Sequence, residues 1–141
     1  MAATILSQVY AYTEEKVREW PVPSGTAKGT AILSASSQPG VTLTPRGDAT
    51  ASKTLGGVYT LTYPNGAVGQ RSDSAQVAVD GTWAGPVAGA TSSTAKNTLV
   101  YIDSTGALTL TATSNTKFGV VDSYPGKASS TDTAVKIGVF A

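Results

Sequence analysis

The side chains that most often carry out catalysis are scarce in this sequence of 141 residues. It contains no histidine, the commonest acid–base residue, and no cysteine, so thiolate chemistry and cysteine-ligated zinc are excluded. A serine activated by a lysine is the nucleophile–base pair that remains, and it needs an uncharged lysine. The candidate lysines stand in polar stretches, where the ammonium group stays protonated: Lys28, Lys53, Lys96, Lys117, Lys127 and Lys136. We therefore expect no catalytic residues, no metal ion and no cofactor.

The nine acidic residues are scattered, and outside residues 14–19 no two of them lie close together in the sequence. Asp80 precedes Gly81, and Asp103 begins a turn-like stretch, so both stand where turns favour aspartate. Arg46-Gly47-Asp48 spells the integrin-binding tripeptide, which we also interpret as a turn. An enzyme with a serine–lysine or two-carboxylate site stays an alternative, although no spacing in the sequence favours it.

The composition excludes several kinds of partner. Only 13% of the residues are charged and the net charge is +1, so no basic excess is present to neutralise phosphates. No apolar run approaches the roughly twenty residues that a membrane-spanning helix needs. Hydrophobic residues make up 40% of the chain, which is enough to build a core. We therefore expect a folded domain that binds neither nucleic acid nor a membrane.

Short segments with β-type patterns, separated by turns, dominate the chain after residue 23. In residues 57–63, for example, Tyr59 and Leu61 alternate with Val58 and Thr60. The strands predicted in this way are residues 31–33, 41–44, 57–63, 75–79, 82–84, 99–102, 107–111, 118–121 and 134–140. This series predicts a mainly β fold, a small β-barrel or sandwich of short antiparallel strands.

Two pairs of these segments predict hairpins. Asp80-Gly81 is typical of a two-residue hairpin turn, because glycine accepts a positive φ freely, and the register would pair Ala78 with Trp83. Residues 99–102 and 107–111 flank a four-residue turn and predict a second hairpin.

The first 23 residues differ from the rest in composition. Thr13 can cap a helix whose first turn is acidic, which predicts a short helix over residues 13–20, and Pro21 and Pro23 would end it. We therefore expect an extended N-terminal arm over residues 1–23 and a β-rich domain over residues 24–141.

Aromatic side chains give this arm candidate anchors. Tyr10, Tyr12 and Trp20 lie close together in the sequence and could each bury a large apolar area on a partner. Trp83, in a predicted hairpin, is expected in the core or at a subunit contact. A carbohydrate-binding module that uses Trp83 and nearby tyrosines is an alternative from a different functional class.

Three features in the second half of the chain occur together in a characteristic order. They are the segment from Val77-Ala78-Val79-Asp80-Gly81-Thr82-Trp83 to Ala90, the segment from Thr98-Leu99-Val100-Tyr101-Ile102-Asp103 to Thr113, and Lys117-Phe118-Gly119-Val120-Val121 with a terminal Val135-Lys136-Ile137-Gly138-Val139. Over roughly residues 55–141 this order resembles the capsid decoration, or cement, proteins of tailed bacteriophages. The charged stretch that ends at Trp20 and a long segment over residues 41–57 depart from the family pattern.

The resemblance implies a small β-barrel-like domain, often trimeric, on the outer surface of the expanded head. Its partners would be the major capsid protein and other copies of itself, and it would be assembled in the host bacterial cytoplasm. The arm would then strap onto the shell or a neighbouring copy, and deleting residues 2–23 would leave the domain folded. Candidate interface residues are Tyr10, Tyr12, Val17, Trp20, Pro21, Pro23 and Trp83. The alternative within phages is a tail-tube or fibre-associated β-domain.

Overall fold

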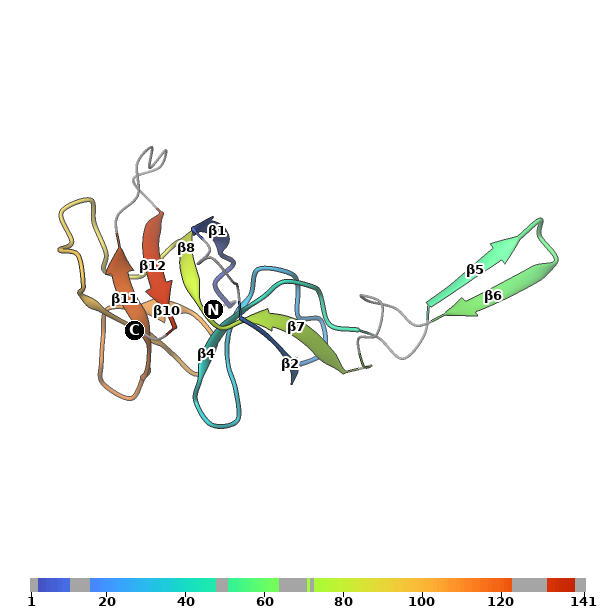
Figure 1. Ribbon diagram of the computed structural model, residues 1–141, viewed down its shortest axis with the longest axis horizontal. Coiled ribbons are helices and arrows are strands. Elements are labelled where there is room, and N and C mark those ends of the chain that lie inside the picture. Colours follow the sequence, from blue (N-terminus) through green and yellow to red (C-terminus); the bar gives the residue numbers. More distant parts are fainter. Residues whose placement is uncertain are drawn as a thin grey trace.

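The computed structural model describes residues 3–10, 16–47, 51–63, 71, 73–122 and 132–138. Within these ranges the regular secondary structure consists of strands, which form three antiparallel sheets (Figure 1). The largest sheet contains, in spatial order, β1 (Ser7–Tyr10), β8 (Gly81–Gly85), β12 (Thr133–Ile137), β11 (Thr116–Asp122), β9 (Leu99–Ile102) and β10 (Leu108–Thr109).

The second sheet has four strands, and the third is a hairpin. The four-stranded sheet has the order β2 (Val17–Pro21), β7 (Ser74–Ala78), β4 (Pro39–Thr42) and β3 (Ala31–Leu33). The hairpin consists of β5 (Ala51–Leu55) and β6 (Tyr59–Tyr63), which pair with each other. Figure 1 shows this hairpin standing clear of the other two sheets.

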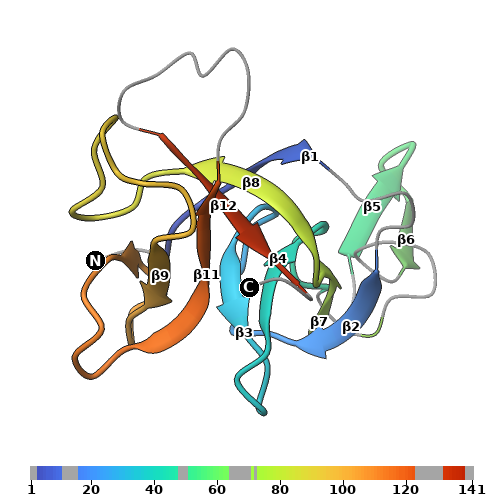
Figure 2. The same cartoon turned by 60° about the vertical axis from the view of Figure 1, so that its left-hand side comes forward.

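The hydrophobic core lies between the two larger sheets, which cross in Figure 2. Phe118 and Val135 reach it from the six-stranded sheet, and Val41 and Ala78 reach it from the four-stranded sheet. All four are fully buried. The structure is therefore a small β-sandwich, as the sequence predicts.

Most of the predicted strands are confirmed. The predicted hairpin around residues 103–106 is present, with Leu108 opposite Ile102. Residues 118–121 lie in β11, and residues 134–137 lie in β12. In each of these strands alternate or consecutive apolar side chains face the core, so local pattern and tertiary packing agree.

Asp103 organises the turn between β9 and β10. Its Oδ1 atom accepts hydrogen bonds from the Thr105 hydroxyl at 2.6 Å, the Thr105 N–H at 2.8 Å and the Ala107 N–H at 3.0 Å. The bond from the Thr105 hydroxyl, followed by that from Ala107, lowers the pKa of Asp103 below its ordinary value of 3.8. The turn aspartate is thus held in its charged form.

Acid should therefore weaken this turn. A carboxyl group whose pKa falls on folding stabilises the folded state above its unfolded pKa, and this contribution disappears as the pH falls through the folded pKa. We expect the melting temperature of the wild type to fall more steeply than that of Asp103→Asn between about pH 5 and about pH 2. Thermal unfolding followed by circular dichroism measures both slopes, and equal slopes would contradict the assignment.

The predicted hairpin at Asp80-Gly81 is wrong. β7 belongs to the four-stranded sheet and β8 to the six-stranded sheet, so the chain crosses between the sheets at this point. Both strands are largely buried and have partners on both edges, β2 and β4 for β7, and β1 and β12 for β8. Gly81 has a φ of 100°, which suits a sharp corner as well as a hairpin turn. The pairing partners of β7 and β8, which lie in different sheets, distinguish the corner from the hairpin.

The predicted helix over residues 13–20 is also wrong where the structure describes it. Residues 17–20 belong to β2, which pairs with β7 from Val17 opposite Ala78 to Pro21 opposite Ser74, and residues 13–15 lie outside the described residues. β2 is an edge strand, where charged residues and proline are well tolerated. Pairing with β7 therefore outweighs the helix-capping signal of the local sequence.

Residues 3–10 and 16–22, part of the expected arm, are built into the sandwich. β1 pairs with β8 and β2 pairs with β7, and both Leu6 and Val22 are buried. Thr4 accepts the N–H of Leu108 on its side chain and the N–H of Ala31 on its carbonyl, each at 3.0 Å. The expected boundary between arm and domain is therefore not visible in these residues.

Candidate interaction surface

The β5–β6 hairpin has an apolar face and a hydroxyl face. Leu55 lies opposite Tyr59 and Thr54 lies opposite Thr60 in the antiparallel register. Because side chains alternate along a strand, Leu61 shares the face of Tyr59 and Leu55, whereas the threonines occupy the other face. The hairpin thus has the pattern of a half-buried ribbon.

The apolar face is nevertheless exposed. The exposed fractions are 46% for Leu55, 75% for Tyr59 and 53% for Leu61, and Val58 at the turn reaches 79%. A contiguous exposed apolar patch is typical of an interaction site in a soluble protein. A two-stranded hairpin is also only marginally stable in water on its own. A partner that covers these side chains would contribute about 1–2 kcal/mol for each, and would stabilise the hairpin.

An ion pair and two backbone hydrogen bonds connect the chain segments before and after the β5–β6 hairpin. Arg46 Nη2 donates to Asp73 Oδ1 at 2.5 Å. The N–H of Gly47 donates to the Ser74 carbonyl at 2.9 Å, and the N–H of Asp73 donates to the Gly47 carbonyl at 2.8 Å. These contacts extend the β4–β7 pairing and hold residues 46–47 next to residues 73–74, on either side of the hairpin in the sequence. The arginine of the Arg46-Gly47-Asp48 tripeptide is thus engaged in an ion pair, while Asp48 lies outside the described residues.

The structure separates Trp83 from the other residues that the sequence proposes as an interface, of which Val17, Trp20 and Pro21 lie together on β2. Trp83 is buried in the core, and its Nε1–H donates to the Asp80 carbonyl at 3.0 Å, so its assignment to an interface is corrected. Val17, Pro21 and Pro23 are exposed, the first two on the edge strand β2. Tyr12 and the side chain of Tyr10 lie outside the described residues.

Trp20 has a packing role in the four-stranded sheet. A Cβ atom built on Gly40 would lie 2.7 Å from Cζ3 of Trp20 and would also collide with Val77. Gly40 is therefore the gap that lets the indole ring cross the neighbouring strands. Trp20 is half-buried, so part of its ring packs within this sheet and part remains accessible.

The apolar hairpin face was missed as a site in the sequence. The alternation of Tyr59, Leu61 and Tyr63 correctly predicts a strand, but an apolar face in a strand normally points into the core. The structure shows why the face stays open: β6 pairs with β5, and no third strand among the described residues joins this hairpin.

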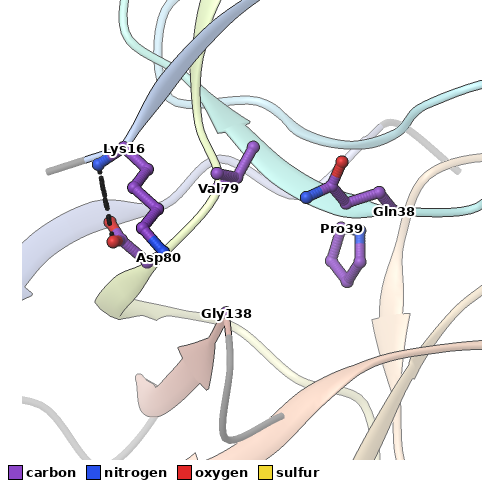
Figure 3. A pocket seen from close by; sticks show the side chains of 6 residues that line it. All are labelled: Lys16, Gln38, Pro39, Val79, Asp80 and Gly138. Atoms are coloured by element: carbon purple, nitrogen blue, oxygen red, sulfur yellow. Dashed lines mark hydrogen bonds between the residues drawn. The ribbon is translucent and has the colours of Figure 1, made fainter.

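A small pocket lies where the chain crosses between the sheets (Figure 3). It has a volume of about 240 Å³, and the described residues that line it are Lys16, Gln38, Pro39, Val79, Asp80 and Gly138. The buried Asp80 carboxylate faces the Lys16 N–H, which lies 3.4 Å from each of its oxygens, and the Val79 N–H donates to the Lys16 carbonyl at 3.0 Å. These contacts tie the start of β2 to the crossing. The lining has neither a serine nor a second carboxylate, so it offers no nucleophile–base pair.

The residues that the structure describes offer no other candidate of two common kinds, a metal site or a membrane-spanning helix. Among them, no three acidic residues gather in a way that could hold a metal ion. In the same part of the chain, no helix has the length and apolar character needed to cross a membrane. The hairpin is therefore the candidate site that the described residues support best.

Comparison of the chain with protein-family models, with curated proteins and with solved structures found no match.

Proposed function

We propose that this chain is a structural virion protein that decorates the outside of an expanded bacteriophage head. The sequence resemblance supports the proposal, and the segments that carry it contribute neighbouring strands to one sheet. Residues 77–90 include β8, residues 98–113 include β9 and β10, and residues 117–121 lie in β11, beside β12. The strands of these segments are thus neighbours in the six-stranded sheet.

The observation that carries the proposal is the exposed apolar face of the β5–β6 hairpin. Leu55, Tyr59 and Leu61 are exposed, and the two-stranded ribbon that carries them pairs with no further strand among the described residues. Such a surface is complete only against another protein, as expected of a subunit in an assembly.

Assembly on a shell also makes weak contacts sufficient. The partners we propose are the major capsid protein and other copies of this chain. Each contact can be modest, because many copies held on one surface bind with high avidity. No chemical step is part of this function; the protein acts by clamping its neighbours.

The test is co-sedimentation of the purified protein with expanded shells of its phage that lack this component. Unexpanded shells serve as the control. We expect saturable binding to expanded shells alone. Binding to neither shell would overturn the proposal, and assembly of the purified protein into tubes or fibres would then favour a tail component.

The hairpin face should matter for this binding. We expect Tyr59→Ser combined with Leu61→Ser to weaken shell association by at least about tenfold, because two apolar side chains lose their cover. Thr54→Ala combined with Thr60→Ala changes the opposite face and should leave binding unchanged. Circular dichroism should show equal stability for all variants, since these residues lie outside the core. Equal shell binding by both double variants would remove the hairpin from the interface.

A further inference from the structure

The sandwich carries an uncharged groove with a volume of about 420 Å³. Ile5, Pro23, Ala27 and Ile32 supply apolar surface, and Thr26 and Thr105 supply hydroxyl groups. No charged residue is among the described residues that line it. Ile5 is 53% exposed, although its backbone forms a β-bridge with Thr30. A β-branched aliphatic side chain is thus left uncovered in a concave site.

The β5–β6 hairpin has apolar side chains that suit this apolar, uncharged groove. Residues 51–63 contain a single charged residue, Lys53, and otherwise carry apolar and hydroxyl side chains. Lys53 lies opposite Leu61, on the face of Leu55 and Tyr59 but further from the turn. The part of the face next to the turn, with Leu55, Val58 and Tyr59, carries no charge and can enter an uncharged apolar groove without removing water from a charged group. The absence of a basic cluster on the hairpin likewise gives phosphate-bearing partners nothing to bind.

We infer that the apolar face of the β5–β6 hairpin of one copy lies in this groove on a second copy of the chain. The inference rests on the proposed role of the hairpin as an assembly element and names its partner. The hairpins then link neighbouring copies to one another on the shell. Loss of the hairpin face would weaken shell association through lost avidity between the linked copies.

The size of the two surfaces favours a closed ring of copies, in which each copy makes two such contacts. The exposed hairpin face covers a few hundred Å², less than the roughly 800 Å² per partner that a stable complex buries. A copy that gives its hairpin to one neighbour and receives a hairpin from another makes two such contacts. Because hairpin and groove are different surfaces, the contact is heterologous, and it closes into a ring when the rotation between copies permits.

Cysteine cross-linking tests this contact directly, because the chain has no cysteine of its own. Tyr59→Cys places a thiol on the apolar face, and Ala27→Cys places one at an exposed position that lines the groove. We expect a mixture of these two single variants to form the mixed disulfide dimer under mild oxidation. Thr60→Cys mixed with Ala27→Cys is the matched control, with the thiol on the opposite face, and should give at least about tenfold less dimer.

Self-association in solution provides a second measurement. Light scattering coupled to size-exclusion chromatography should show an assembly of the wild type, and Leu61→Ser or Ile5→Ser should each raise its dissociation constant at least about tenfold. A strictly monomeric wild type that gives no mixed dimer would overturn the inference.

Shell binding separates this inference from the proposed function. A monomeric chain whose shell binding is lost in the hairpin variant would show that the shell protein covers the hairpin, which overturns the inference and keeps the function. Self-association and cross-linking without any shell binding would keep the inference and overturn the function.

Discussion

A chain that starts at Ser24 is expected not to fold. The deletion removes β1 and β2, which pair with β8 and β7. It also removes the buried side chains of Leu6 and Val22, each of which contributes about 2 kcal/mol by burial. The free energy of unfolding of a domain of this size is only about 5–15 kcal/mol. We expect the loss of two strands to destabilise the fold by more than this amount.

Thr4 adds to this effect. It connects Leu108, Ala31 and Gly106, three positions that lie on different segments of the sandwich, through hydrogen bonds of 3.0 Å each. Without Thr4 these backbone groups lose their partners in a buried region, which costs about 1–3 kcal/mol for each group left unpaired.

Circular dichroism and one-dimensional NMR of the truncated chain measure the outcome. A chain that lacks only residues 1–2 is the control and should unfold cooperatively like the wild type. A cooperative transition in the chain starting at Ser24 would contradict the structure and would restore residues 1–23 as a separable arm.

Trp83→Ala is expected to destabilise the fold by about 3–5 kcal/mol. Trp83 is 3% exposed, belongs to the core cluster and donates its Nε1–H to the Asp80 carbonyl. The substitution therefore leaves a large cavity and also an unpaired carbonyl at the crossing between the sheets. The measurement is urea unfolding followed by circular dichroism, which gives the free energy of unfolding.

Tyr59→Ala is the matched control for this prediction. Its side chain is also aromatic but 75% exposed, so its removal should change the free energy of unfolding by about 0.5 kcal/mol or less. If the two substitutions destabilised the fold equally, Trp83 would not occupy the core as described. The pair thus distinguishes a core tryptophan from an interface aromatic.

The β character of the chain and most of its strands were predictable from the sequence. Residues 99–102, 107–111 and 118–121 predict their strands because each alternates or clusters apolar residues between turn residues. The turn at Asp103 was predictable for the same local reason, since the aspartate binds backbone N–H groups two and four residues further along the chain.

Predictions failed where the outcome depends on a distant strand. The residues around Asp80-Gly81 fit a hairpin locally, and Thr13–Trp20 fits a helix, but pairing of β7 with β2 and β4 overrides both. Local sequence carries no information about which sheet a strand joins, because hydrogen bonds between strands form between residues far apart in the chain.

For the candidate site, too, part of the answer came from the sequence and part from the tertiary structure. The sequence by itself determined that the chain is a β protein without histidine or cysteine chemistry, and that Tyr59 and Leu61 share one face of a strand. Only the tertiary structure decided that this face is exposed while Trp83 is buried. The reason is that an alternating pattern specifies a face but not what covers it; coverage depends on how the sheets pack against one another.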